Sequence, residues 1–136
     1  MKMRLAGAIA ALLLLTSCGV LSAGKLVLPA AEDLESVTIT VDQLDLTVTG
    51  GDSIAQLLDL LRRSVKENTG RPSVRDVPSE RAGLARIDFG FRAGGTGTVF
   101  LYREGARLFL EQPYQGIYEM DSELRLDQLQ TIEQEG

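Results

Sequence analysis

The sequence predicts an α+β fold: a single antiparallel β-sheet, arranged as a β-meander, with one main amphipathic helix and a short C-terminal helix packed on one face. Three observations predict it. The second half of the chain contains several segments that alternate apolar and polar residues, and short turns separate these segments. A stripe of leucines with helical spacing precedes them. Strands joined by short turns pair antiparallel, and such a sheet needs helices on only one face.

The amino terminus has the order of an export signal. Met1–Arg4 is a short basic segment, and Leu5–Leu15 follows as eleven consecutive residues drawn only from Leu, Ala, Gly and Ile. As a helix this run spans roughly 16 Å, against a hydrocarbon core of about 30 Å. It is therefore too short to cross a bilayer, and it has the length of the apolar region of a signal peptide.

The segment that follows, Leu15-Thr16-Ser17-Cys18-Gly19, resembles the lipobox of bacterial lipoproteins: an aliphatic residue, two small residues and then Cys. The resemblance implies a lipid on the Cys18 sulfur and cleavage after Ser17. Two or more acyl chains hold a protein stably on a membrane. The alternative is an ordinary cleavable signal with a chance Cys.

These observations divide the chain into three parts. We expect a lipoprotein signal peptide at 1–17, a lipidated N-terminus and tether at 18–34, and an α+β extracytoplasmic domain at 35–136. Within the tether, Leu26–Leu28 is either a short edge strand ended by Pro29 or a linker whose apolar residues lie against the domain or the lipid headgroups.

The first half of the domain predicts two strands and a helix. Residues 35–41 alternate apolar and hydroxyl side chains, Leu44, Leu46 and Val48 repeat the alternation, and Asp42-Gln43 between them makes either a hairpin turn or a bend in one strand. The spacing of Ser53 and Gln56 predicts a capping box that opens a helix. The apolar stripe of that helix is Ile54, Leu57, Leu58, Leu61 and Val65.

The same helix should end near Asn68, Gly70 and Pro72. Arg62, Arg63 and Lys66 form a basic cluster at its carboxyl end, where the helix dipole favours cations. We interpret the cluster as a solvated helix end; the alternative is a binding patch.

The second half predicts a loop, four strands and a helix. Pro72 and Pro78 keep the loop free of regular structure, and Glu104-Gly105 forms a tight turn. The loop covers 69–82, the strands lie near 86–92, 98–103, 107–111 and 116–120, and Asp121 caps a short helix with Leu124, Leu126, Leu129 and Ile132.

The charge and residue counts exclude several classes of function. The chain has 14 basic and 19 acidic residues; loss of Lys2 and Arg4 with the signal leaves 12 against 19, a formal charge of −7. An acidic domain without a basic stripe is a poor nucleic-acid binder. A chain with one Cys and no His has no internal disulfide and lacks the commonest general base and metal ligand. We therefore expect no cofactor and no metal.

From about Pro72 onward the chain resembles a family of uncharacterised surface lipoproteins of Firmicutes, catalogued as a domain of unknown function. The residues that carry the resemblance are Ser73–Pro78, Ile87–Phe89, Val99–Tyr102 and above all Leu110–Tyr118, with its run E-Q-P-Y-Q-G-I-Y. One departure is Phe109, where such sequences often have Tyr. The resemblance implies a membrane-anchored extracellular domain and carries no activity.

The candidate binding surface is the turn that contains this run, with its flanks: Glu111, Gln112, Pro113, Tyr114, Gln115, Gly116 and Tyr118. Tyr114 and Tyr118 would give a partner amphipathic contact area at low entropy cost. The structural alternative is that Pro113 fixes the turn, Gly116 takes a left-handed or bulged conformation, and Tyr114 covers the sheet edge.

Three functional hypotheses follow. The first is a non-enzymatic module that binds an envelope protein or peptide, held on the outside of the cell membrane by Cys18. The second is a structural or accessory subunit of an envelope complex. The third is a hydrolase that uses only the carboxylates of Asp88, Glu111, Glu119 and Asp121, but salt bridges to arginines on neighbouring strands explain these more simply. No catalytic residue is assigned.

Overall fold

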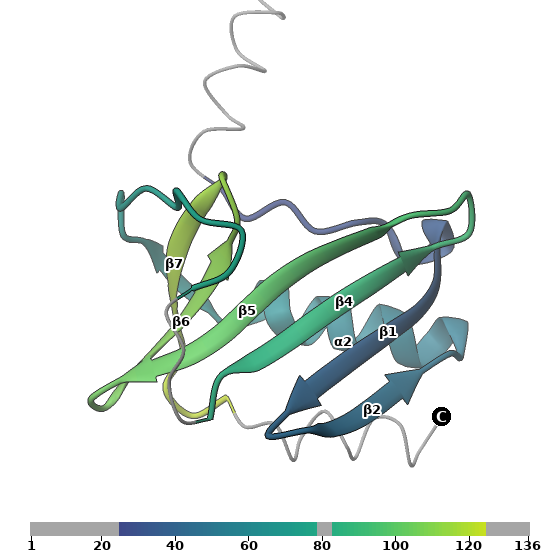
Figure 1. Cartoon of the computed structure of the whole chain (residues 1–136), viewed down its shortest axis with the longest axis horizontal. Helices are drawn as coiled ribbons and strands as arrows, with labels where there is room; N and C mark the ends of the chain where they lie inside the picture. The colour runs from purple at the N-terminus through teal and green to yellow at the C-terminus, as the bar shows by residue number, and fades with distance from the viewer. Residues whose placement is uncertain (1–24, 79–82, 125–136) are drawn as a thin grey trace, which may run out of the picture.

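The computed structural model describes residues 25–78 and 83–124 (Figure 1). Its elements in chain order are η1 (Ala31–Asp33), β1 (Leu34–Val41), β2 (Leu44–Val48), α2 (Gly51–Arg63), β3 (Val65–Asn68), β4 (Ala85–Phe91), β5 (Thr96–Glu104), β6 (Arg107–Gln112) and β7 (Gly116–Met120). Within the described residues, seven strands form one antiparallel sheet, and α2 lies across one of its faces. The predicted sheet with one main helix is thereby confirmed in outline, although strands predominate. The predicted C-terminal helix lies largely outside the described residues.

The order of the strands across the sheet is β2-β1-β4-β5-β6-β7-β3. Strands β4 to β7 are sequential antiparallel neighbours, which confirms the predicted meander. The β1–β2 hairpin pairs with one side of this meander through β4, and β3 pairs with the other side through β7. Helix α2 has 13 residues, is therefore about 20 Å long, and connects the edge strand β2 with the edge strand β3.

Both predicted ends of the helix were wrong. The residue that precedes the helix is Gly50, with no side-chain cap, and Ser53 is buried inside the first turn instead of opening it. At the other end the helix stops at Arg63, where both the amide and the hydroxyl of the C-cap residue Ser64 donate to the Leu60 carbonyl oxygen, at 3.1 and 2.7 Å.

Residues that the sequence assigned to the last turn of the helix form the edge strand β3 instead. Val65 pairs with Met120 and Asn68 with Tyr118, and the backbone amide of Asp121 donates to the Ser64 carbonyl oxygen at 2.6 Å. The spacing of Val65 from Leu61 fits a helix, but pairing with β7 satisfies the backbone groups that an ended helix leaves open.

Strands β1 and β2 form a hairpin, so Asp42-Gln43 is a hairpin turn and not a bend in one strand. Asp42 and Gln43 both have positive φ, at 49° and 70°, as a two-residue type I′ turn requires. The predicted inward alternation holds at Val48, which is buried, but is wrong at Leu44, whose side chain is 76% exposed at the open edge of the sheet.

The main core lies between α2 and the sheet. Ile54, Leu57, Leu58 and Leu61 are all fully buried, as their helical spacing predicts. They pack with inward residues of the strands, which include Val37, Ile39, Ile87, Phe89, Val99, Leu101, Leu110 and Met120. No helix in the described part of the chain is long and apolar enough to cross a membrane.

A second, smaller core lies on the opposite face of the sheet. It contains Phe100, Tyr102, Phe109 and Ile117, with Leu84 packed against them. Residues 99–102 are four consecutive buried apolar or aromatic residues because β5 is covered on both faces there: one face packs with the helix side and the other with this cluster.

We expect Leu58→Ala to lower the free energy of unfolding by about 2–5 kcal/mol, because it leaves a cavity between α2 and the sheet. Urea unfolding measures this. The matched control is Leu44→Ala, which removes the same atoms at an exposed position and should change stability by less than about 0.5 kcal/mol. Equal effects of the two substitutions would contradict this placement of the core.

Candidate functional site

The predicted turn joins β6 to β7. Within the turn the backbone amide of Gln115 donates to the Gln112 carbonyl oxygen at 2.9 Å, and Gln112 pairs with Gly116 across the hairpin. The left-handed residue is Tyr114, with φ of 61°, so the expectation that Gly116 adopts this conformation was wrong. A non-glycine residue in this region is uncommon and costs free energy unless its surroundings hold it.

The structure separates the predicted surface residues into two groups. Tyr114 and Gln115 are exposed, and Gln112 and Pro113 are partly exposed. Glu111, Gly116 and Tyr118 are buried and face the interior, so a partner cannot contact their side chains without rearrangement. The Tyr118 hydroxyl donates to the Lys25 carbonyl oxygen at 3.2 Å and so holds the segment that enters the domain.

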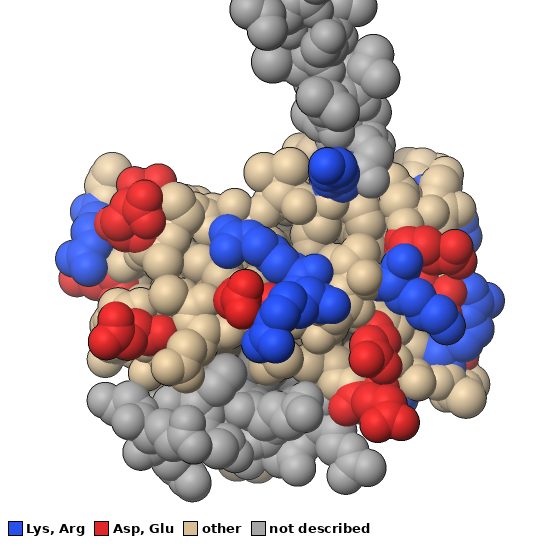
Figure 2. Space-filling view, turned by 180° about the vertical axis from the view of Figure 1, so that it is seen from behind, with Lys and Arg blue, Asp and Glu red and all other residues tan. Residues whose placement is uncertain are grey.

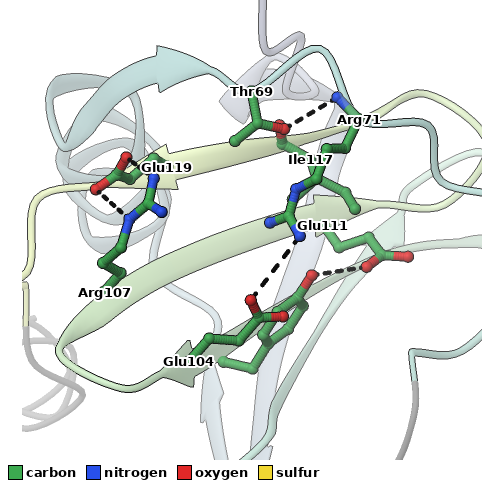
Figure 3. Close-up of polar contacts among 8 residues, drawn as sticks. Thr69, Arg71, Glu104, Arg107, Glu111, Ile117 and Glu119 are labelled. Atoms are coloured by element: carbon green, nitrogen blue, oxygen red, sulfur yellow. Dashed lines mark hydrogen bonds and ion pairs between the residues drawn. The ribbon is translucent and has the colours of Figure 1, made fainter.

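The Glu111 carboxylate is the centre of a buried hydrogen-bond network (Figure 3). One oxygen accepts from the Tyr102 hydroxyl at 2.9 Å, the contact drawn in Figure 3. The other accepts from the Ser73 hydroxyl at 2.8 Å. Burial and this contact with Glu111 raise the pKa of the Tyr102 hydroxyl well above its ordinary value, so the hydroxyl remains a donor. A buried charge is tolerated only when donors of this kind satisfy it.

The same network holds the left-handed turn residue. The Ser73 oxygen accepts from the backbone amide of Tyr114 at 3.2 Å while its proton goes to Glu111. A hydrogen bond between the Tyr114 hydroxyl and the Asp76 carboxylate raises the pKa of that hydroxyl. Tyr114 is therefore attached at both ends to the loop that follows β3.

That loop is fixed to the sheet at its start. The amide and the hydroxyl of Thr69 both donate to the Ile117 carbonyl oxygen, at 3.1 and 2.7 Å (Figure 3). Ser73 and Pro78 are buried, whereas Val74 and Val77 are 70% and 50% exposed. The loop thus presents apolar side chains to solvent from a backbone that is held in place.

A groove of about 370 Å³ lies on the other side of the turn. One wall is the N-terminal segment at Val27 and Pro29, the other is formed by Gln112, Pro113 and Gln115, and aromatic and aliphatic side chains of β4 and β5 form the floor, among them Phe89, Phe91 and Val99. The Gln112 side-chain amide donates to the Val27 carbonyl oxygen at 2.8 Å and fixes the distance between the two walls.

Sequence reasoning missed the contributions of Val27, Val74 and Val77 to this region. Val27 was assigned to a short edge strand or a linker within the tether, and Val74 and Val77 to the loop at 69–82. They meet the turn through contacts between residues far apart in the sequence, 85 positions in the case of Gln112 and Val27. Cys18, the predicted lipidation site, lies outside the described residues.

Two arginines lie over the ring of Phe109 near the edge strand. The guanidinium carbons of Arg71 and Arg107 are 4.8 and 5.1 Å from its centroid. Arg107 also contacts Glu119 at 2.7 Å, and Arg71 contacts Glu104 at 3.8 Å (Figure 3). The predicted pairing of carboxylates with arginines on neighbouring strands thus occurs at Glu119, while Asp88 pairs with Arg86 of its own strand.

Comparison with known proteins identifies the domain without describing an activity. A family model, DUF5301, described as "Domain of unknown function (DUF5300)", matches residues 22–119. No curated protein matches the chain. The chain is similar to a protein from Ruminococcus gnavus whose structure was determined by NMR: identity is 27%, the TM-score is 0.63, and the match covers 78% of this chain and 99% of that one.

We expect Ser73→Ala to lower the free energy of unfolding by about 1–3 kcal/mol, because it leaves the buried Glu111 carboxylate without one donor. It should also speed hydrogen exchange at the Tyr114 amide, which loses its acceptor. The control is Ser122→Ala at an exposed serine, expected to change stability by less than about 0.5 kcal/mol. Unchanged exchange at Tyr114 would show that Ser73 does not hold the turn.

Stability should also depend on pH through Glu119. Its hydrogen bond with Arg107 lowers the pKa of this carboxyl in the folded protein, so the pair stabilises the fold above the ordinary carboxyl pKa and stops doing so as pH falls through the lowered value. Arg107→Gln should therefore destabilise the protein more at neutral pH than in acid, where the contact of Arg107 with the Phe109 ring remains but the ion pair does not. Urea unfolding at both pH values measures this, and an equal difference at the two pH values would contradict it.

Proposed function

We propose that this chain, which belongs to the DUF5301 family of domains of unknown function, is a lipid-anchored extracytoplasmic module that binds a protein or peptide at the 112–116 turn. The export signal and the lipobox-like segment that ends at Cys18 support the anchor. The surface described above supports binding. The proposal assigns the module no catalytic step.

The observation that carries the proposal is that most exposed large hydrophobic side chains of the described residues belong to one turn or to segments bonded to it. Among the described residues the exposed large hydrophobic side chains are Val27, Leu44, Val74, Val77 and Tyr114. All except Leu44 belong to segments bonded to the turn: Val27 through Gln112, and residues 73–77 through Ser73 and Asp76. Isolated exposed apolar residues are ordinary, but a cluster rimmed by polar groups marks an interaction surface.

The groove adds a recess to this surface. Its volume of about 370 Å³, apolar floor and glutamine-lined wall suit a short peptide segment that inserts one or two apolar side chains. Tyr114 belongs to the same turn and is held at its amide and its hydroxyl by the loop after β3, so that little conformational entropy is lost when a partner covers the ring.

The contacts of the carboxylates favour binding over hydrolysis. Glu111 is buried and accepts from two hydroxyls, Glu119 is paired with Arg107, and Asp88 accepts from Arg86 and from the Thr98 hydroxyl at 2.6 Å. Each is thus engaged with donors of its own fold. A carboxylate that acts as a general base needs a free oxygen directed at the substrate.

One observation supports the second candidate, an accessory subunit of an envelope complex. Strand β2 forms one end of the described sheet, and Leu44 is 76% exposed beside its open backbone edge. Such an edge accepts a strand from another chain. This reading places a constitutive contact at β2 instead of at the turn.

A pair of matched variants separates the two candidates. We expect Tyr114→Ala to weaken capture of the native partner about tenfold or more, as loss of a central aromatic anchor does. Leu44→Ala removes an exposed apolar side chain at the β2 edge, the contact site of the second candidate, and should leave capture unchanged. Crosslinking in cells followed by quantitative mass spectrometry measures both. Loss with Leu44→Ala alone would overturn the proposal in favour of the edge contact.

A further inference from the structure

The chain enters the described domain a short distance from its predicted anchor. Lys25 follows Cys18 by seven residues, and seven residues span at most about 25 Å when fully extended. If Cys18 carries lipid, as proposed above, Lys25 stays within about 25 Å of the membrane surface. The part of the domain around Lys25 is therefore within reach of the lipid headgroups.

A pocket of about 390 Å³ opens beside Lys25. The side chains of Lys25 and Arg62 supply two positive charges to its lining, Glu67 supplies one negative charge, and Asn68 and Tyr118 supply polar groups. The Arg62 guanidinium donates to the Pro29 carbonyl oxygen at 3.2 Å, which fixes it next to the entering chain. The lining thus has an excess of one positive charge on a domain that is acidic as a whole.

Further basic side chains follow at the end of α2 and in β3. Arg63 and Lys66 are both exposed and contact Asp59 at 2.8 Å and Glu119 at 3.9 Å. Figure 2 shows Lys and Arg side chains spread over the helix side of the molecule, with carboxylates between them. The sequence interpreted Arg62, Arg63 and Lys66 as a solvated helix end; the structure adds Lys25 and a recess between Lys25 and Arg62.

We infer that the Lys25–Arg62 pocket binds the phosphate-bearing headgroup of an anionic phospholipid in the membrane that holds the anchor. Lys25 and Arg62 outweigh the Glu67 carboxylate and leave a net positive charge for a phosphate diester, to which Asn68 adds an amide. The apolar side chains of Leu26 and Val65 in the lining match the glycerol and upper acyl region. The lipid on Cys18 provides the attachment, and the pocket sets the orientation of the domain.

This orientation leaves the proposed recognition surface open. Residues 25–29 separate the two recesses, since Lys25 lines the headgroup pocket while Val27 and Pro29 line the groove beside the turn. A headgroup bound on one side of this segment does not occupy the other. A partner would therefore be met close to the membrane surface.

The test uses the full-length lipoprotein, purified from membranes and reconstituted into vesicles. Because Cys18 is the only cysteine and its sulfur is acylated, a new cysteine is the only free thiol for a fluorescent label. One label is placed at Val27→Cys, and the other at Ala106→Cys, at the opposite end of β6. Nitroxide-bearing headgroup lipids quench labels that lie at the membrane surface.

We expect the Val27 label to be quenched more strongly in vesicles of equal phosphatidylcholine and phosphatidylglycerol than in phosphatidylcholine alone, and the Ala106 label to show no such increase. Lys25→Gln should reduce the headgroup-bound population about fivefold. Ala106→Glu, which changes the net charge by the same amount, should leave it unchanged. Arg62→Gln tests the second cation of the pocket in the same way. Because Lys25 is exposed, its substitution does not threaten folding.

The outcomes separate the pocket from the anchor. If the protein floats with phosphatidylcholine vesicles and the Val27 label is quenched equally in both kinds of vesicle, the headgroup site is overturned but the lipid anchor is supported. Equal losses with Lys25→Gln and Ala106→Glu would also overturn it, since only the overall charge would then matter. Failure to float with phosphatidylcholine vesicles would overturn the lipid anchor and the headgroup site together.

Discussion

Burial of the Glu111 carboxylate requires two hydroxyl donors, and the position of those donors decides the shape of the surface around the 112–116 turn. Tyr102 supplies one from the neighbouring strand, and Ser73 supplies the other from a loop 38 positions away in sequence. Since Ser73 also accepts from the amide of Tyr114, the charge, the loop and the left-handed turn residue depend on one another. Together with the Tyr114–Asp76 hydrogen bond, this network holds the segment that carries Val74 and Val77 beside Tyr114.

Local patterns predicted the parts of the fold that local interactions determine. The helical stripe from Ile54 to Leu61 and the four strands of the meander were predicted from spacing and short turns, and they are where the sequence placed them. Strand β3 was not predicted, because Val65 also fits the helical spacing and only pairing with β7, more than 50 positions later, decides against it. The exposure of Leu44 depends on β2 being an edge strand, which the alternation pattern does not reveal.

The candidate site likewise combines features that local patterns predict with features that depend on contacts between distant residues. The sequence located the turn and its exposed Tyr114, but it assigned Glu111 and Tyr118 to the surface because a strand pattern does not tell which faces of the sheet are covered. Here both faces are covered at β5 and β6, one by α2 and the other by the loop after β3. The N-terminal segment, interpreted as a tether, lies against the domain, with Leu28 buried and three of its carbonyl oxygens accepting from Arg62, Gln112 and Tyr118. That contact forms both recesses on which the functional proposals rest.

The central claim is that partners meet the surface made by the turn and the loop after β3. The most direct measurement is a photocrosslinking scan in living cells, with a photoreactive amino acid placed singly at Val74, Val77 and Gln115, and at Leu44 and Ala106 as distant exposed positions. The account predicts that the first three positions crosslink to one and the same protein or peptide and that the last two do not. Crosslinks to that partner from Leu44, or none from the three positions around the turn, would contradict it.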